Sequence, residues 1–187
     1  ATQRRKIVSI IKAYHGHTGL AVKTGDDRFS KLFLSEDTVG EFVQVPFNDL
    51  NTIEDALKRQ DVAAVIMETI PATYGFPMPE EGYLPSVKQL CERYDTLYIA
   101  DEVQTGLMRT GELWGCTKYK VQPDIMVTGK GISGGMYPIA CVLISEKCGG
   151  WLKEDGFGHM STMGGAELGC VVAMKTLEIV QRPEVRS

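Results

Sequence analysis

The stretch LYIADEVQTG, residues 97–106, decides the fold, because in it an apolar strand runs directly into polar residues. The apolar residues predict a strand over Leu97–Asp101 that is buried on both faces. Its last residue, Asp101, places a carboxylate at the edge where open α/β sheets bind ligands. An aspartate at a strand end is often only a turn residue or a helix cap, so Asp101 alone does not establish a ligand site.

Similar apolar runs recur along the chain, with helical patterns between them. One helix is expected to begin with a capping box of Asn51 and Glu54, another to open at Pro85, and a last one to run from about Ala166 to Val180. This alternation predicts an α/β fold with a mostly parallel sheet and helices on both faces. The other predicted strands are Lys6–Ile11, Phe42–Val45, Val62–Glu68, Asp124–Thr128 and Ile139–Ser145.

The last two predicted strands are joined by a short, glycine-rich connection. It has only about ten residues, too few for a helical crossover, so we expect residues 139–145 to run antiparallel to their neighbour. A long loop rich in proline and glycine, residues 71–82, follows the third strand. It lies at the carboxyl edge of the predicted sheet, where we expect a ligand.

Composition narrows the classes of partner. The chain has 187 residues, of which 43% are hydrophobic, and this suits one compact domain. A net charge of −4 gives no basic surface for a nucleic acid or an anionic membrane. The longest apolar runs, 62–67 and 139–144, are far shorter than the roughly 20 residues that span a bilayer. The five cysteines form no CxxC pair, and we expect reduced thiols in a cytoplasmic protein.

A second polar cluster is Thr128-Gly129-Lys130-Gly131, at the end of another predicted strand. A lone lysine in such a place is more often a surface residue than a functional amine. Together with Asp101, however, Lys130 forms the pair that pyridoxal phosphate needs. The amine holds the cofactor's aldehyde as an imine, and the carboxylate keeps its pyridine nitrogen protonated.

Around these two residues the sequence resembles the class III aminotransferases. The resemblance is carried by YIADEVQTGLMRTGELW and QPDIMVTGKGISGGMYPIA, and it extends to KAYHGHTG and VIMET upstream and to HMSTMGGAELGC downstream. It covers nearly the whole chain in order. It implies the large domain of a fold type I pyridoxal-phosphate enzyme that moves an amino group from an amino acid or amine to a 2-oxo acid.

The resemblance also implies roles for single residues. Lys130 would form the Schiff base with pyridoxal phosphate and carry the proton between substrate and cofactor. Asp101 would pair with the pyridinium nitrogen, and Gln104 would approach the phenolic oxygen. Val103 and Tyr14 would pack on opposite faces of the ring. Without the motif, Tyr14 is explained equally well as a residue of the core.

Further positions concern the surroundings of the cofactor. His15 would lie beside the ring-stacking tyrosine, although by itself it is explained equally well as a satisfied loop histidine. A metal site of His15 and His17 is weaker still, because no cysteine or carboxylate cluster lies near them in sequence. His17 replaces an arginine of many members, whose usual partner is retained as Glu68, so a weaker pair is expected. Thr73 stands where ornithine and acetylornithine enzymes carry a second glutamate, whereas KGISGGMYPIACVL is similar to the ornithine branch, and the amino donor stays open.

The resemblance bears finally on assembly and extent. Thr162 matches a threonine that reaches the phosphate of the neighbouring subunit, which implies a homodimer with shared sites. The resemblance does not include the family's phosphate-binding loop or its C-terminal small domain. We therefore expect residues 1–187 to be the central part of the large domain. An aminomutase or a phospho-lyase would use the same Lys130 and Asp101, and a catalytically incomplete fragment would keep only the fold. A nucleotide-binding module is disfavoured, because no GxGxxG or GxxxxGK[ST] pattern follows a strand.

Overall fold

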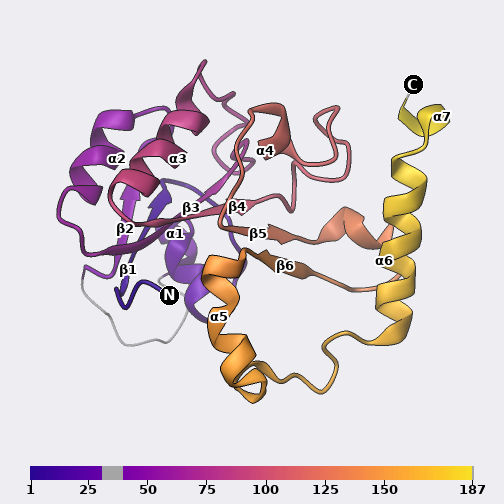
Figure 1. Ribbon diagram of the computed structural model, residues 1–187. Coiled ribbons are helices and arrows are strands. Elements are labelled where there is room, and N and C mark those ends of the chain that lie inside the picture. Colours follow the sequence, from indigo (N-terminus) through magenta and orange to yellow (C-terminus); the bar gives the residue numbers. More distant parts are fainter. Residues whose placement is uncertain (31–39, 187) are drawn as a thin grey trace.

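A six-stranded sheet forms the centre of the computed structural model, which describes residues 1–30 and 40–186 (Figure 1). Its strands are β1 (Lys6–Ile10), β2 (Phe42–Val45), β3 (Val62–Glu68), β4 (Leu97–Asp101), β5 (Ile125–Thr128) and β6 (Cys141–Ile144). The strand order is β2-β1-β3-β4-β5-β6. The strands from β1 to β5 pair in parallel, and β6 pairs antiparallel with β5. The predicted sheet, with one antiparallel strand, is therefore confirmed.

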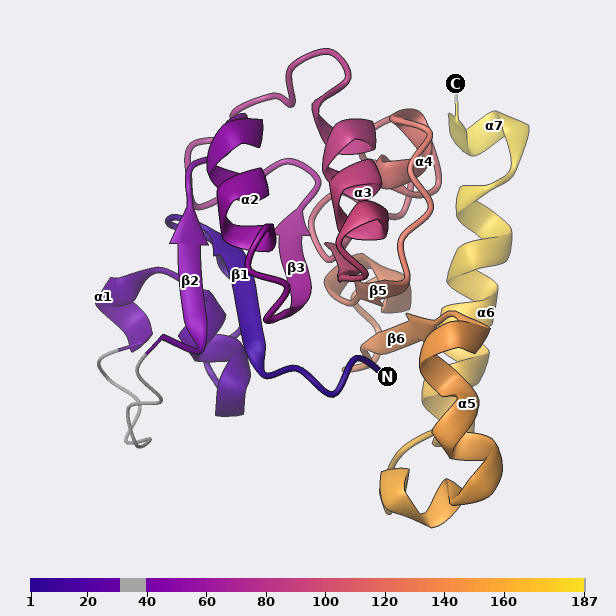
Figure 2. The same ribbon diagram turned by 60° about the vertical axis from the view of Figure 1, so that its left-hand side comes forward.

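Helices cover both faces of this sheet, as predicted. On one face, α2 (Leu50–Leu57) and α3 (Tyr83–Arg93) lie side by side (Figure 2). On the other face, Cys148 of α5 (Glu146–Glu154) packs with Ala64 and Leu97. The short turn η1 (Gly19–Thr24) packs against β1 and β2. The main core lies between the sheet and the α2–α3 pair and includes Val8, Ile10, Ile53, Leu57, Val65, Leu84, Val87 and Tyr98.

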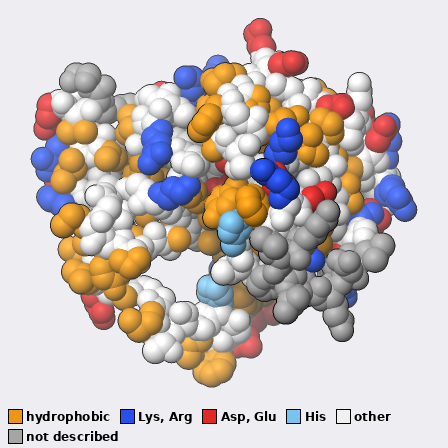
Figure 3. Space-filling model, turned by 180° about the vertical axis from the view of Figure 1, so that it is seen from behind, with side chains coloured by type: hydrophobic (Ala, Val, Ile, Leu, Met, Phe, Trp, Pro, Cys, Tyr) orange, Lys and Arg blue, Asp and Glu red, His pale blue; other side chains and the backbone are white. Residues whose placement is uncertain are grey.

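The remaining elements lie around this centre. The predicted C-terminal helix is confirmed as α6 (Glu167–Val180), which lies beyond β6 (Figure 1). Hydrophobic side chains gather on the segment that joins α5 to α6, at the lower left of Figure 3. In the described part of the chain, no residue after Met126 belongs to the main core. The short elements are α1 (Asp27–Ser30), α4 (Gly115–Lys118), η2 (Lys130–Ser133), η3 (Gly156–His159) and α7 (Pro183–Arg186).

The start of α2 differs from the predicted capping box. The N-cap is Asp49, whose Oδ1 accepts a hydrogen bond from Thr52 N at 3.0 Å and whose Oδ2 accepts one from Thr52 Oγ1 at 2.6 Å. Glu54 instead binds Arg93 and Tyr94 of α3 and its end. The prediction from Asn51 and Glu54 was wrong because an aspartate two residues earlier supplies the capping oxygens.

No helix within residues 1–30 and 40–186 combines the length and the apolar character that crossing a bilayer requires.

Candidate active site

The carboxyl ends of β1, β3 and β4 bring three predicted site residues together. The register of β3 and β4 pairs Glu68 with Asp101, so the two carboxyl groups leave neighbouring strands on the same face. His15 follows β1, and its Nδ1 lies 2.8 Å from Asp101 Oδ2. The His15 side chain is 2% exposed and that of Asp101 is 7% exposed, so this contact is nearly free of solvent.

Each carboxyl oxygen of Asp101 has one polar partner and can still accept a further hydrogen bond. Oδ1 accepts a hydrogen bond from Val103 N at 3.0 Å, and Oδ2 faces His15. A carboxylate offers about four acceptor positions, so Asp101 can take a further donor. The other ring nitrogen of His15, Nε2, is buried and has no hydrogen-bond partner among the described residues. A neutral His15 that donates from Nδ1 would leave Nε2 as a hydrogen-bond acceptor.

Glu68 fixes two loop segments to the end of β3. Its Oε1 accepts from Tyr14 N and its Oε2 accepts from Ala72 N, each at 3.1 Å. Burial raises the pKa of Glu68, although these two N–H donors lower it. Backbone groups thus occupy the carboxyl oxygens that the sequence assigned to a pair with His17.

Tyr14 lies at the surface, with 38% of it exposed, and not in the core. Its ring is edge-on to His17 with the centroids 4.9 Å apart, and the His17 ring lies 4.7 Å from that of Phe29. These three rings form one aromatic cluster next to the buried Asp101–His15 pair. An exposed tyrosine ring held by its neighbours can stack on a planar ligand.

Lys130 follows the end of the adjacent strand, β5. Val127 of β5 pairs with Asp101, and Lys130 follows shortly after the strand ends. Its backbone has a φ of 43°, which is uncommon for a lysine, and it is exposed. A Cβ placed on Gly129 would lie 3.7 Å from Val103 Cγ2, so Val103 packs beside the start of the lysine turn. The backbone oxygen of Lys130 accepts a hydrogen bond from Ser133 Oγ at 3.5 Å, whereas its side-chain amine has no hydrogen-bond or ion-pair partner in the described part of the chain.

The two remaining predicted residues are Gln104 and Thr162. Gln104 is half-buried in the turn after β4, and its Oε1 accepts from Arg109 at 3.4 Å. Thr162 is exposed between η3 and α6, on the segment that leaves the sheet beyond α5 (Figure 1). The structure therefore does not bring Thr162 to the Asp101–His15 pair.

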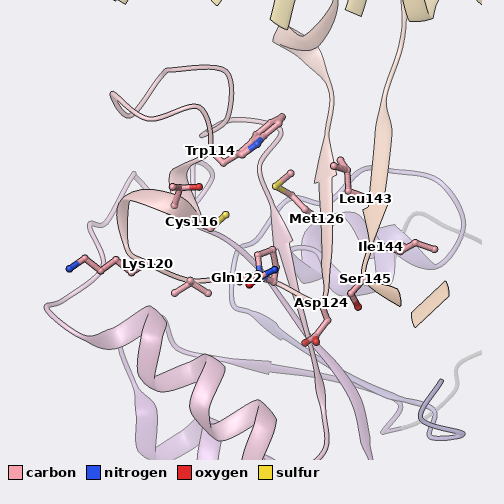
Figure 4. A pocket seen from close by; sticks show the side chains of 12 residues that line it. Trp114, Cys116, Lys120, Gln122, Asp124, Met126, Leu143, Ile144 and Ser145 are labelled. Carbon is pink, nitrogen blue, oxygen red and sulfur yellow. The ribbon is translucent and has the colours of Figure 1, made fainter. Parts of the chain in front are cut away.

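The structure contains a cavity beside the Asp101–His15 pair and another one farther from it. One, of about 690 Å³, runs from His15 and Asp101 along the apolar sheet face formed by Ile7, Ile66 and Ile99. Another, of about 480 Å³, lies between β6 and the segment before β5 (Figure 4). The Asp124 carboxylate there accepts from Tyr98 N and Lys88 Nζ, so its role is structural. The first cavity is the one that adjoins the candidate site.

Glu102 is a buried acid in this region to which the sequence had assigned no role. It is fully buried and accepts hydrogen bonds from four donors. A usable signal existed, because successive residues at a strand end point to opposite faces. If Asp101 faces the ligand, Glu102 must face the core, where a carboxylate needs partners.

Comparison with known proteins decides the family. All residues, 1–187, match the aminotransferase class-III family. The chain belongs to the class III aminotransferases. Pyridoxal phosphate is the cofactor of this family, and the α/β sheet described above is its fold type I architecture, as expected from the sequence.

Two relatives of this chain show how much of the length of a class III aminotransferase the chain covers. An uncharacterized aminotransferase from Archaeoglobus fulgidus is 50% identical over 181 residues, which are 97% of this chain and 42% of that protein. The mitochondrial ornithine aminotransferase of Drosophila melanogaster is 39% identical over 180 residues, which are 96% of this chain and 41% of that protein. The chain therefore spans less than half the length of these relatives.

Solved structures agree with these sequences. An ornithine aminotransferase from Toxoplasma gondii superposes with a TM-score of 0.89 at 33% identity, over 98% of this chain and 43% of that chain. An acetylornithine aminotransferase from Elizabethkingia anophelis gives 0.78 at 36% identity, over 97% and 43%. A further structure of the Toxoplasma gondii enzyme is described as having partial occupancy of PLP at its active site.

Proposed function

We propose that residues 1–187 are the central part of the cofactor-binding domain of a transaminase, with Lys130 as the lysine that binds pyridoxal phosphate. The observation that carries the proposal is the buried Asp101–His15 contact at the end of β4. The neighbouring strand β5 ends at Thr128, two positions before Lys130, so an amine and a buried carboxylate follow adjacent strand ends. The family's cofactor requires this combination.

The residues present suit the cofactor. Asp101 has acceptor capacity left after binding Val103 N and His15, which is what a protonated ring nitrogen needs. Val103 lies beside Gly129, between the carboxylate and the lysine turn, where it can cover one ring face. Tyr14 is exposed next to the pair and can cover the other face. Gln104 lies on the same turn and would approach the phenolic oxygen.

The proposed chemistry divides among the chain's own residues. When bound, pyridoxal phosphate supplies an aldehyde that condenses with amines and a ring that withdraws electrons. Lys130 would hold the aldehyde carbon until the amine of the donor displaces it, and the freed Lys130 amine would then move a proton at the substrate carbon as general base. Asp101 keeps the ring nitrogen protonated, and His15 holds the Asp101 carboxylate in one orientation. Glu68 fixes the backbone of Tyr14.

The substrates we propose are an amino acid or amine as donor and a 2-oxo acid as acceptor. Similarity to ornithine aminotransferases supports a diamino acid donor, whereas Thr73 departs from that branch. We further propose a homodimer in which Thr162 contributes to the partner's site, because that residue is exposed and distant from its own cluster. The free cysteines support a reducing, cytoplasmic setting.

The test compares Lys130→Ala with Lys120→Ala. Lys120 is a matched control, because it is also an exposed lysine with a left-handed backbone, at a φ of 57°. Each protein is mixed with pyridoxal phosphate, its absorption spectrum is recorded, and the adduct is reduced with borohydride and mapped by mass spectrometry.

We expect a visible band in the wild-type chain and in Lys120→Ala that is lost in Lys130→Ala, with the adduct on Lys130. An adduct on other lysines, or a band that survives in Lys130→Ala, would contradict the assignment. No band in any of the three proteins would mean that residues 1–187 alone do not hold the cofactor.

A further inference from the structure

Glu102 is a fully buried carboxylate with every acceptor position used. Its Oε1 accepts from Thr69 Oγ1 at 2.5 Å and from Cys116 N at 2.8 Å. Its Oε2 accepts from Thr105 Oγ1 at 2.8 Å and from Gly115 N at 2.7 Å. The residue has no exposed surface. Hydrogen bonds to a carboxylate are about twice as strong as neutral ones, and burial makes the loss of any partner costly.

These four donors come from three segments. Thr69 follows β3, Thr105 lies in the turn after β4, and Gly115 with Cys116 begins α4. The Glu102 side chain therefore closes the loop 106–114 at both ends and fastens it to the neighbouring strand. Backbone contacts add to this closure, since Gly106 N donates to Glu102 O at 2.9 Å.

Close packing shows that the arrangement leaves little freedom. A Cβ on Gly115 would lie 2.9 Å from Thr105 Cβ and 3.2 Å from Glu102 Oε2. A Cβ on Gly106 would lie 2.7 Å from Glu102 O and 2.8 Å from the Trp114 ring. Glycine is required at both positions by the approach of these groups.

The neighbours of Glu102 in sequence belong to the proposed cofactor site. Asp101 faces His15, and Val103 donates its N–H to Asp101 and lies against Gly129. The Glu102 side chain points the opposite way, into its four donors. Its anchoring therefore fixes the main chain between Asp101 and Val103 without touching a ligand on their side.

We infer that Glu102 is a positioning residue for the proposed cofactor site. Its buried carboxylate holds the turn 103–106, and so sets where Val103 and Gln104 meet the ring. The effect of Glu102 on the cofactor rests on the proposed function, whereas the ordering of the turn 103–106 does not. It also explains why an acid is needed directly after Asp101, because an apolar residue would leave four donors without an acceptor.

The decisive variant is Glu102→Gln, which keeps the shape but places an NH₂ donor against N–H and O–H donors. Thr69→Val removes a single donor with little change of volume and serves as the milder variant. Ile53→Val is the control, because Ile53 is fully buried in α2 and lies outside this network. It lowers stability without touching the turn.

The first readout is amide hydrogen exchange without cofactor. We expect the amides of Gly106, Gly115 and Cys116 to exchange about tenfold faster or more in Glu102→Gln, and less so in Thr69→Val. Ile53→Val is measured under conditions that give it the same free energy of unfolding as Glu102→Gln. In Ile53→Val, the exchange rates of these three amides should rise no more than those of the amides in the sheet. If Glu102→Gln raises exchange uniformly, or not at all, the turn is not ordered by Glu102. Should Glu102→Gln fail to fold, the same comparison in Thr69→Val decides.

The second readout is pyridoxal phosphate binding, followed by the absorbance and circular dichroism of the bound band. We expect binding to weaken by about tenfold or more in Glu102→Gln and the dichroism to change, with Ile53→Val unchanged. Wild-type affinity and dichroism in Glu102→Gln would overturn the positioning role. A wild-type chain without a Lys130 adduct would overturn the proposed function instead, and the exchange rates alone would then decide whether Glu102 orders the turn.

Discussion

His15 Nδ1 lies 2.8 Å from Asp101 Oδ2, although 86 positions separate the two residues in sequence. The contact forms because β1 and β4 are parallel and flank β3, so their carboxyl ends open on the same edge of the sheet. Both side chains are nearly excluded from solvent. A buried carboxylate depends on such a partner, and its loss has a measurable cost.

Replacing His15 by phenylalanine should destabilise the chain. His15→Phe keeps a ring of similar size but leaves Asp101 Oδ2 buried without its partner, which costs about 1–3 kcal/mol. His17→Phe is the matched control, because within the described residues the exposed His17 ring contacts the rings of Tyr14 and Phe29, and its replacement should stay within about 0.5 kcal/mol. Urea unfolding at one pH measures both. Equal losses in the two variants would show that the Asp101 contact contributes nothing.

The stability difference between wild type and Glu68→Gln should depend on pH. Burial raises the pKa of Glu68 in the folded chain above its ordinary 4.5, so its contribution is fully present below that value and is lost as pH rises through the folded pKa. Wild type should therefore lose stability relative to Glu68→Gln between about pH 4 and pH 7. Unfolding free energies at both pH values test this.

Asp26 provides the comparison of opposite sign. The Arg28 guanidinium lowers the pKa of Asp26, so this group stabilises the fold above its unfolded pKa and stops doing so as pH falls through the folded pKa. The difference between wild type and Asp26→Asn should grow with pH, the reverse of the trend for Glu68. The same trend in both variants would contradict the burial of Glu68 as the cause.

Two glycine replacements should have opposite effects. In Gly106→Ala the new Cβ would lie 2.7 Å from Glu102 O and 2.8 Å from Trp114 Cε3, and we expect a loss of about 1–3 kcal/mol from overpacking. Gly150 lies within α5 with nothing within 4 Å of an added Cβ, so Gly150→Ala should stabilise by about 0.4–1 kcal/mol. Thermal unfolding of both variants checks the sign. If Gly106→Ala left the unfolding temperature unchanged, the loop 106–114 would be able to shift and make room for the added Cβ.

The cysteines should separate by reactivity. Burial raises the pKa of Cys91 and of Cys116 to about 12, so neither forms much thiolate near pH 8. Cys141 and Cys170 are only partly buried. A thiol reagent should therefore label Cys141 and Cys170 in the folded chain and reach Cys91 and Cys116 only in denaturant. Mass mapping of the labelled sites gives the order, and early labelling of Cys91 would show that the core opens.

Local patterns were enough for the sheet because each strand carries its own signal. The apolar runs that became β3 and β4 were visible as continuous segments, and their bounds agree with the structure. The antiparallel direction of β6 followed from the length of its connection to β5. The cap of α2 was misplaced because Asp49 and Asn51 are both good capping residues, and only the backbone decides which one is used.

The sequence by itself determined the class of fold and the family, and it predicted the pair of chemical groups, Asp101 and Lys130, because these inferences depend on residue type and order along the chain. Only the tertiary structure decided which atoms satisfy the buried acids. Glu68 holds the backbone of Tyr14, and Glu102 collects donors from three segments. Each buried charge needs partners at hydrogen-bond distance, and these come from parts of the chain that meet only when the sheet has formed.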